Sequence, residues 1–171
     1  MNDSLFSVKD QVVLVSGGSR GIGKAIAKGF ADREAQVVIT GRKQETLAQT
    51  AADLAADRGN VHPKVCDAAN KAALDTLVEE IVAEFGRIDT LVNCAGVNKR
   101  MPVENYDEAA YDFITNVNIR GAFFLAQTVG RQMMGQGRGA IINIDSLNSD
   151  RPLSHVTPYA MSKAAMRQMT R

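Results

Sequence analysis

Val12-Val13-Leu14-Val15-Ser16-Gly17-Gly18-Ser19-Arg20-Gly21-Ile22-Gly23 is the stretch that decides the fold. Its apolar first half has no polar alternation, which is typical of a strand covered on both faces of a parallel sheet. The apolar residues after the glycines recur at helical spacing: Ile22, Ala25, Ile26, Gly29 and Phe30. A strand, a glycine turn and a helix in this order favour phosphate binding, because the glycines let backbone N–H groups approach a pyrophosphate.

Short β-branched runs and helical patterns continue to alternate along the chain. Further strands are predicted at 37–39, 61–66, 91–92 and 140–144, and further helices at 47–55, 74–85, 114–125 and from Tyr159 onward. Strands without polar alternation, separated by helices, indicate an α/β fold with a parallel sheet. Right-handed crossovers then predict a doubly wound (Rossmann) sheet with helices on both faces.

Composition narrows the classes of function. The 171 residues carry a formal net charge of +1 without blocks of like charge, which argues against a nucleic-acid partner. The longest apolar runs have strand length, so no membrane partner is predicted. Cys66 and Cys94 lack the spacing of a metal site, and the first residues do not resemble a signal peptide. We therefore expect a cytoplasmic protein without a bound metal.

The second strand carries a hint about the cofactor. A carboxylate at its end would bind the ribose 2′-hydroxyl of NAD, but the chain has Thr40-Gly41-Arg42 there. Arg42 and Arg20 can instead clamp a 2′-phosphate, since guanidinium groups bind phosphate through paired hydrogen bonds. The sequence thus favours NADP (NADPH) over NAD.

Four polar residues are candidate catalytic groups. Asn118 lies on the apolar stripe of a helix, and Ser146 follows the fifth strand. Tyr159 and Lys163 are four residues apart, so they share one helix face. An ammonium beside a phenol stabilises the phenolate, and such a pair can exchange a proton near neutral pH. Each residue alone is more often structural: a hydrogen-bonded core Asn, a helix-capping Ser, a surface Tyr and a surface Lys. Together behind a dinucleotide turn, however, they favour acid–base chemistry.

These motifs resemble the short-chain dehydrogenase/reductase (SDR) family over essentially the whole chain. The family's Thr-Gly-x-x-x-Gly-x-Gly motif appears as Ser16 to Gly23, and its Asn-Asn-Ala-Gly motif as Asn93-Cys94-Ala95-Gly96. The Asn-Ser-Tyr-Lys tetrad falls on Asn118, Ser146, Tyr159 and Lys163. Ser16 keeps the hydroxyl of the family's threonine, whereas Cys94 replaces an amide.

The resemblance implies an NADP-dependent oxidoreductase that interconverts a secondary alcohol and a ketone. Tyr159 would be the acid and base, Lys163 would assist it and hold the nicotinamide ribose, Ser146 would orient the substrate oxygen, and Asn118 would hold a relay water. Cofactor binding is implied for Gly17, Ser19, Arg20, Gly21, Ile22, Gly23, Arg42, Asp67, Asn93, Ala95, Gly96, Tyr159 and Lys163, with Asp67 at the adenine. The family also implies a homodimer or homotetramer.

The small-molecule substrate is less constrained. Residues 98–102 and 157–160 resemble the gluconate 5-dehydrogenase-like branch, in which case Arg100 would pair with a substrate carboxylate. The alternative is that Lys99 and Arg100 form an exposed basic pair. A 3-oxoacyl-acyl-carrier-protein reductase is the main rival, because it often has the same glycine turn. His155 is either a pocket residue or a solvated loop residue.

The family normally continues beyond the Tyr–Lys helix, whereas this chain ends at Arg171. We therefore expect residues 1–171 to form a single NAD(P)-binding Rossmann domain that is truncated within this helix. A fragment that binds a dinucleotide without catalysis is the alternative from a different class of function.

Overall fold

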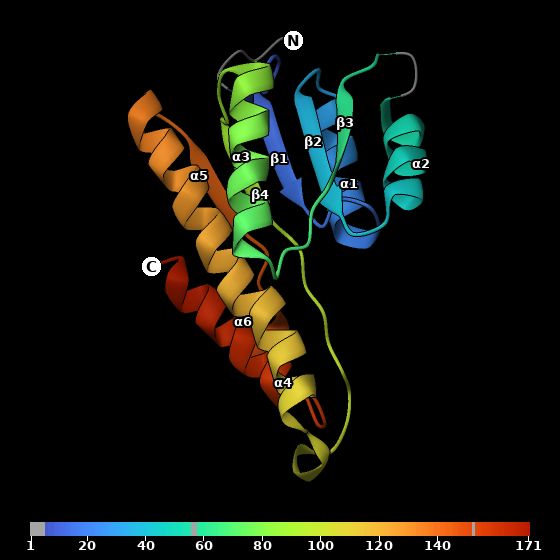
Figure 1. Cartoon of the computed structure of the whole chain (residues 1–171), viewed down its shortest axis with the longest axis vertical. Helices are drawn as coiled ribbons and strands as arrows, with labels where there is room; N and C mark the ends of the chain where they lie inside the picture. The colour runs from blue at the N-terminus through green and yellow to red at the C-terminus, as the bar shows by residue number, and fades with distance from the viewer. Residues whose placement is uncertain (1–5, 56–57, 152) are drawn as a thin grey trace.

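The protein is a five-stranded parallel sheet between two layers of helices, with a second group of helices beyond one end of the sheet (Figure 1). The computed structural model describes residues 6–55, 58–151 and 153–171. The strands are β1 (Val12–Ser16), β2 (Gln36–Gly41), β3 (Val61–Val65), β4 (Thr90–Asn93) and β5 (Ala140–Asn143). Their order, β3-β2-β1-β4-β5, confirms the predicted doubly wound topology.

The helices alternate with the strands in the predicted way. They are α1 (Gly21–Ala31), α2 (Gln44–Ala55), α3 (Lys71–Phe85), α4 (Glu108–Thr115), α5 (Ala122–Gln136) and α6 (Thr157–Met169), with short 3₁₀ helices η2 (Val103–Asn105) and η4 (Leu147–Ser149) and a π-helix η3 (Asn116–Gly121). None of the helices in the described part of the chain is long and apolar enough to cross a membrane.

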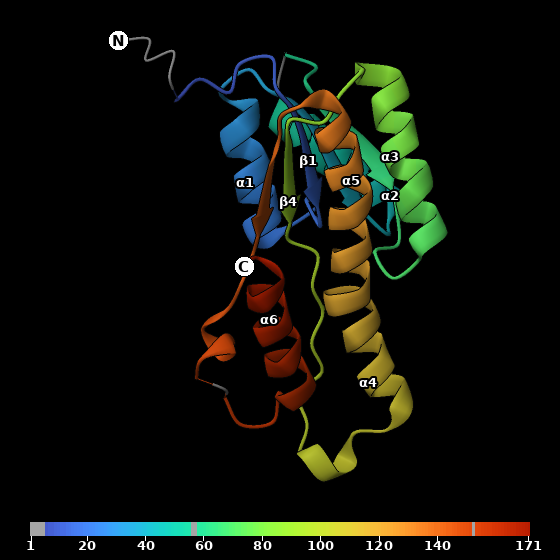
Figure 2. The ribbon, with the colours of Figure 1, turned by 90° about the vertical axis from the view of Figure 1, so that its left-hand side faces the viewer.

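Each face of the sheet has its own apolar core. On one face, Val13 and Val15 of β1 pack with Leu47 of α2 and with small residues of α1. On the other face, Leu14 packs with Ile81 of α3 and with residues of α5. Figure 2 shows α1 on one side of the sheet and α3 and α5 on the other. The alternation of side chains along β1 therefore supplies both cores.

The strand β5 is less buried than β1, β2 and β4. Ala140 is exposed, and Ile142 is 43% exposed to solvent. The reason is position: β5 lies at an edge of the sheet, where it pairs only with β4. In the described residues no strand pairs with the other edge of β5.

The long helix predicted at 114–125 is in fact a composite. It begins at α4, where the Asp107 side chain accepts a 2.7 Å hydrogen bond from the backbone N–H of Ala110, and passes through η3 into α5. Near the end of η3, Gly121 lies against the backbone of Ala68, so close that a Cβ atom would stand 1.9 Å from the Ala68 carbonyl oxygen. The π-turn therefore coincides with a contact that only glycine permits.

The carboxyl ends of β1, β4 and β5 lie level with one another. Ser16 of β1 pairs with Asn93 of β4, and Asn93 pairs with Asn143 of β5. The helices α4 and α6 extend beyond this edge of the sheet (Figures 1 and 2). The glycine turn, the turn after β4 and the start of the β5–α6 loop consequently meet at one place.

Candidate active site

The glycine turn after β1 is held in place by the end of β2 and by the turn after β4. The backbone N–H groups of Gly17 and Gly18 donate to the Thr40 hydroxyl at 3.3 Å and to the Thr40 carbonyl at 3.1 Å. A Cβ on Gly17, whose φ is +80°, would stand 2.7 Å from the Cα of Ala95, and one on Gly23 would stand 2.2 Å from the Gly17 carbonyl oxygen. Three segments thus pack without room for a side chain.

Gly21 differs from these glycines because its open side faces no other residue. Its φ is +55°, and a Cβ there would meet nothing within 4 Å. It begins α1, whose N-cap residue Arg20 makes no side-chain capping bond. The free N–H groups of this first turn and the positive end of the helix dipole suit a pyrophosphate. The turn accordingly fits the dinucleotide predicted from its sequence.

The predicted phosphate clamp lies beside the same turn. Arg20 and Arg42 are both exposed. Their neighbours Ser19 and Gly41 are in close contact, since a Cβ on Gly41 would stand 3.2 Å from the Ser19 hydroxyl. The Thr50 hydroxyl of α2 also donates to the Ser19 carbonyl at 2.9 Å. The structure therefore brings the two segments that carry the arginines together.

Two further predicted cofactor residues differ in their exposure to solvent: Asp67 is exposed, whereas Asn93 is buried. The Asp67 carboxylate follows β3 and accepts a 3.0 Å hydrogen bond from the backbone N–H of Ala69. Asn93 is 3% exposed, and its amide donates to the Ala122 carbonyl at 3.2 Å and to the Asn143 side chain at 3.1 Å. Asn93 thus joins β4 to α5 and β5, which makes it a structural support for the adjoining turn.

The pair that opens α6 has the spacing predicted from its sequence. The Lys163 ammonium lies 5.9 Å from the centre of the Tyr159 ring and donates a 2.6 Å hydrogen bond to the Ile144 carbonyl. Lys163 is only 4% exposed. Burial lowers the pKa of Lys163, while the neighbouring Cys94 and Asp145 act in the opposite direction. A cation is therefore held, at a desolvation cost, beside the phenol.

The Asn118 side chain links η3 to α6 and to the turn after β4, and both its oxygen and its amide nitrogen form hydrogen bonds. Its side-chain oxygen accepts from the Val97 N–H at 2.8 Å, and its amide donates to the Val97 carbonyl at 2.9 Å and to the Ser162 hydroxyl at 3.0 Å. Ser162 in turn donates to the Tyr159 carbonyl at 2.6 Å. Asn118 sits within the π-turn η3, a type of irregularity that is frequent at functional sites. The relay water expected at Asn118 stays a prediction.

Ser146 is the N-cap residue of the 3₁₀ helix η4, in the loop that follows β5. Its hydroxyl oxygen accepts hydrogen bonds from the backbone N–H of Asn148 at 3.2 Å and from the Asn148 side-chain amide at 3.3 Å. Ser146 is therefore a helix cap, one of the structural roles open to it from sequence. Among the residues that the structure describes, none accepts a hydrogen bond from its O–H group.

Arg100 lies on the loop between β4 and η2, which is fastened to the segment preceding Tyr159. The Met101 N–H donates to the His155 carbonyl at 2.9 Å, and the Tyr106 hydroxyl approaches the same carbonyl at 3.4 Å. His155 has a φ of +67°, and both Arg100 and His155 are exposed. The loop thus places a cation near the start of α6, and among the residues that the structure describes no side chain forms a salt bridge with it.

Three contributors to this site were missed from the sequence: Ser162, Asn148 and Thr40. Ser162 could have been found, because a polar residue on the buried side of α6 needs a hydrogen-bond partner. Thr40 gave no such signal, because its partners Gly17 and Gly18 lie in another loop, and Asn148 gave none, because its contacts with Ser146 and Leu153 depend on how the β5–α6 loop folds. In the described part of the chain, no cluster of three or more His, Cys, Asp or Glu side chains is arranged to hold a metal.

A parallel sheet that gathers a glycine turn, two exposed arginines and a Tyr–Lys helix at its carboxyl edge defines a Rossmann-type dinucleotide-binding fold. A family model described as short chain dehydrogenase matches residues 11–171. The chain therefore belongs to the short-chain dehydrogenase family.

Individual relatives point to one part of this family. The chain is 35% identical over 167 residues to the gluconate 5-dehydrogenase of Gluconobacter oxydans, and 36% identical over 158 residues to the D-threitol dehydrogenase of Mycolicibacterium smegmatis. These alignments cover 98% and 92% of this chain. The predicted resemblance to the gluconate 5-dehydrogenase branch is thus confirmed. The chain spans 65% and 61% of the lengths of these two relatives.

A solved structure supports the same relationship. The gluconate 5-dehydrogenase from Burkholderia cenocepacia, described in complex with NADP and tartrate, superimposes with a TM-score of 0.90 at 34% identity. The match covers 96% of this chain and 65% of that chain.

Proposed function

We propose that the protein is an NADP-dependent oxidoreductase that interconverts a secondary alcohol and a ketone, with Tyr159 as acid and base. The observation that carries this proposal is the buried Lys163 ammonium, 5.9 Å from the centre of the Tyr159 ring and anchored on the Ile144 carbonyl at the carboxyl edge of the sheet. In the described residues Lys163 forms no salt bridge. The desolvation cost of its buried cation is therefore best explained by a role in stabilising the Tyr159 phenolate.

The proton chemistry follows from these residues. In the reducing direction the Tyr159 hydroxyl gives its proton to the carbonyl oxygen of the ketone, and the Lys163 cation stabilises the phenolate that remains. The phenolate then regains a proton from solvent. Ser146 donates a hydrogen bond to the same oxygen and stabilises the charge that develops there. The chemistry that a bound nicotinamide supplies is hydride transfer to the carbonyl carbon.

A sugar acid or a related polyhydroxylated ketone is the proposed substrate class. Its support is the similarity to proteins named gluconate 5-dehydrogenase and D-threitol dehydrogenase. The exposed Arg100 is the candidate partner for a carboxylate, because the bond from Met101 to His155 holds its loop beside the start of α6.

The test is a comparison of NADPH consumption with 5-keto-D-gluconate, with a neutral keto-sugar and with a 3-oxoacyl thioester. We expect the first to give the highest kcat/KM. The highest value with the thioester would overturn the sugar-acid proposal in favour of the acyl-carrier-protein reductase. Tight NADPH binding without turnover of any ketone would instead support a non-catalytic dinucleotide-binding role.

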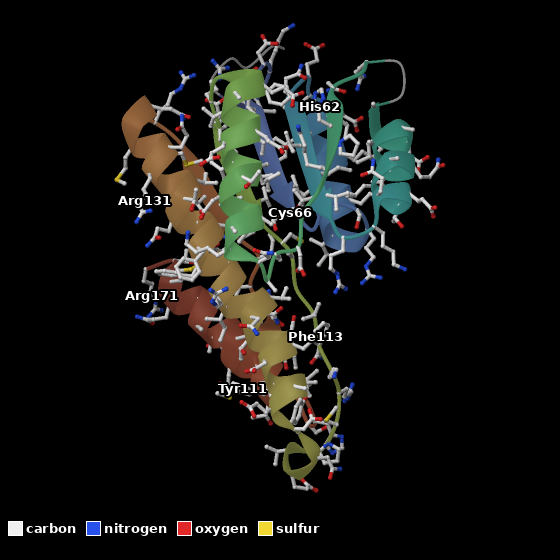
Figure 3. The ribbon with its side chains drawn as sticks, in the orientation of Figure 1. His62, Cys66, Tyr111, Phe113, Arg131 and Arg171 are labelled. Atoms are coloured by element: carbon white, nitrogen blue, oxygen red, sulfur yellow. The ribbon has the colours of Figure 1, made fainter. Side chains whose placement is uncertain are left out.

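The preference for NADP can be tested at Arg42. In Arg42→Ala we expect the affinity for NADPH to fall about 10- to 150-fold, because a charged hydrogen bond to phosphate contributes about 1.5–3 kcal/mol. The affinity for NADH should change little, since NADH lacks the 2′-phosphate. Arg131→Ala is the matched control, because Arg131 is an exposed arginine of α5 (Figure 3). Equal losses for both cofactors, measured by fluorescence titration, would contradict the clamp.

A second copy of the chain is the proposed protein partner. Support comes from a mostly apolar groove between α5 and α6, lined among others by Phe123, Phe124, Ala165, Met166 and Met169. Phe123 is 46% exposed there, which is unusual for a phenylalanine beside other apolar residues. Light scattering should give a mass of two or four chains, and a monomer would contradict this part of the proposal.

A further inference from the structure

Asn148 uses both of its hydrogen-bonding ends in the loop between β5 and α6. Its side-chain oxygen accepts a 3.0 Å hydrogen bond from the backbone N–H of Leu153. Its amide nitrogen lies 3.3 Å from the Ser146 hydroxyl oxygen. The bond to Leu153 fixes the orientation of the amide group, because only the oxygen end can accept from a backbone N–H.

This orientation determines what the Ser146 hydroxyl is able to do. An amide nitrogen is a donor only, so Ser146 must accept the bond from the Asn148 side chain. The backbone N–H of Asn148 is the second donor to the same oxygen, at 3.2 Å. A hydroxyl has two acceptor lone pairs and one proton, so both lone pairs face Asn148 and the O–H group must point away from it. In the part of the chain that the structure describes, no residue receives this proton in a hydrogen bond.

We propose that Asn148 is a positioning residue that makes Ser146 a dedicated hydrogen-bond donor to the substrate oxygen. The inference rests on the proposed function, since it concerns the same oxygen that receives the proton of Tyr159. Asn148 does not touch the substrate and acts only through Ser146. A hydroxyl that is already turned toward the position of the developing alkoxide needs no reorganisation when the charge appears, which is the condition for effective transition-state stabilisation.

A purely structural role is the alternative, because the bond from Leu153 also shapes the loop. The two roles differ in what happens when the amide is replaced by a carboxylate. In Asn148→Asp the side chain keeps an acceptor for Leu153, so the loop bond survives. The facing oxygen, however, is now an acceptor for Ser146, and it draws the O–H away from the substrate. Positioning therefore predicts a loss in kcat with a small change in stability.

The experiment measures kcat, KM and the melting temperature with NADPH and 5-keto-D-gluconate. We expect kcat of Asn148→Asp to fall about 100-fold, near the loss for removing one donor to a developing oxyanion, with KM nearly unchanged. In the Ser146→Ala background the same substitution should have little further effect, because there is no hydroxyl left to orient. Asn105→Asp is the matched control, since Asn105 is an exposed asparagine of the 3₁₀ helix η2.

The outcomes separate the inference from the function on which it rests. A wild-type protein that reduces no ketone would overturn the proposed function, and the inference with it. An active wild type with Asn148→Asp at the same kcat would overturn the inference alone. Additive losses in the double variant, or a large fall in melting temperature that accounts for the lost activity, would also overturn it. If Asn148→Asp fails to fold, Asn148→Ala provides the same comparison, with a smaller expected loss because the hydroxyl can then rotate.

Discussion

Replacement of Tyr159 by phenylalanine is expected to lower kcat by about 10²- to 10⁴-fold, the usual contribution of a positioned acid and base. The change removes one oxygen and leaves the ring beside Lys163 in place. Affinity for NADPH should therefore stay near that of the wild type, and the melting temperature should change little. Stopped-flow or steady-state measurement of NADPH consumption with 5-keto-D-gluconate gives the rate, and fluorescence titration gives the affinity.

Tyr111→Phe is the matched control for this experiment. Tyr111 lies on α4, it is 41% exposed, and its position is labelled in Figure 3. The same loss of a hydroxyl there should leave kcat unchanged. An undiminished kcat in Tyr159→Phe would refute the acid–base assignment, whereas equal losses in both variants would show a general sensitivity to tyrosine substitution.

Replacement of Gly23 by alanine is expected to lower both the affinity for NADPH and the thermal stability of the protein. A Cβ at this position would stand 2.2 Å from the Gly17 carbonyl oxygen, which belongs to the backbone and cannot swing aside. Relief of the contact must separate α1 from the glycine turn. A strain of about 1–3 kcal/mol, typical of overpacking, corresponds to about 5- to 150-fold in NADPH affinity if it falls on the bound form. Fluorescence titration and thermal unfolding measure the two effects.

Gly29→Ala provides the control within the same helix. A Cβ on Gly29 would meet only the Arg33 side chain, at 3.8 Å, so there is room for a methyl group. Alanine is the better helix former by up to about 1 kcal/mol, and this variant should be slightly more stable than the wild type. A Gly23→Ala protein that binds NADPH as well as Gly29→Ala would show that the turn tolerates a side chain and that its close packing is not needed for binding.

The sheet was predictable because it depends on short-range patterns. Apolar runs such as Val12–Val15 mark buried strands, and the glycine turn links the first of them to a helix. The exposure of Ile142 was not predictable in this way, since an apolar run reads alike in a central strand and in an edge strand. What separates the two is the number of neighbouring strands, which is a property of the whole sheet.

In the candidate site, too, contacts between residues close in sequence were predictable, whereas contacts between separate segments were not. Tyr159 and Lys163 are close in sequence, so one helix turn was enough to predict that they meet. The bonds from Asn118 to Val97 and Ser162 join three separate segments, and no spacing rule relates them. The orientation of Ser146 depends on the loop bond between Asn148 and Leu153, which only the folded chain reveals.

The π-turn η3 constrains the number of residues that can connect α4 to α5. The helix α4 packs against α6, whereas α5 buries Leu125 and Val129 in the core beside α3. Successive residues of an α-helix are about 100° apart, so adding or removing one residue turns everything beyond it onto another face. A π-turn holds one residue more per hydrogen-bonded ring than an α-turn. Between Asn116 and Gly121, insertions and deletions should therefore be tolerated less than most substitutions, because they would change the phase between the two halves of the helix.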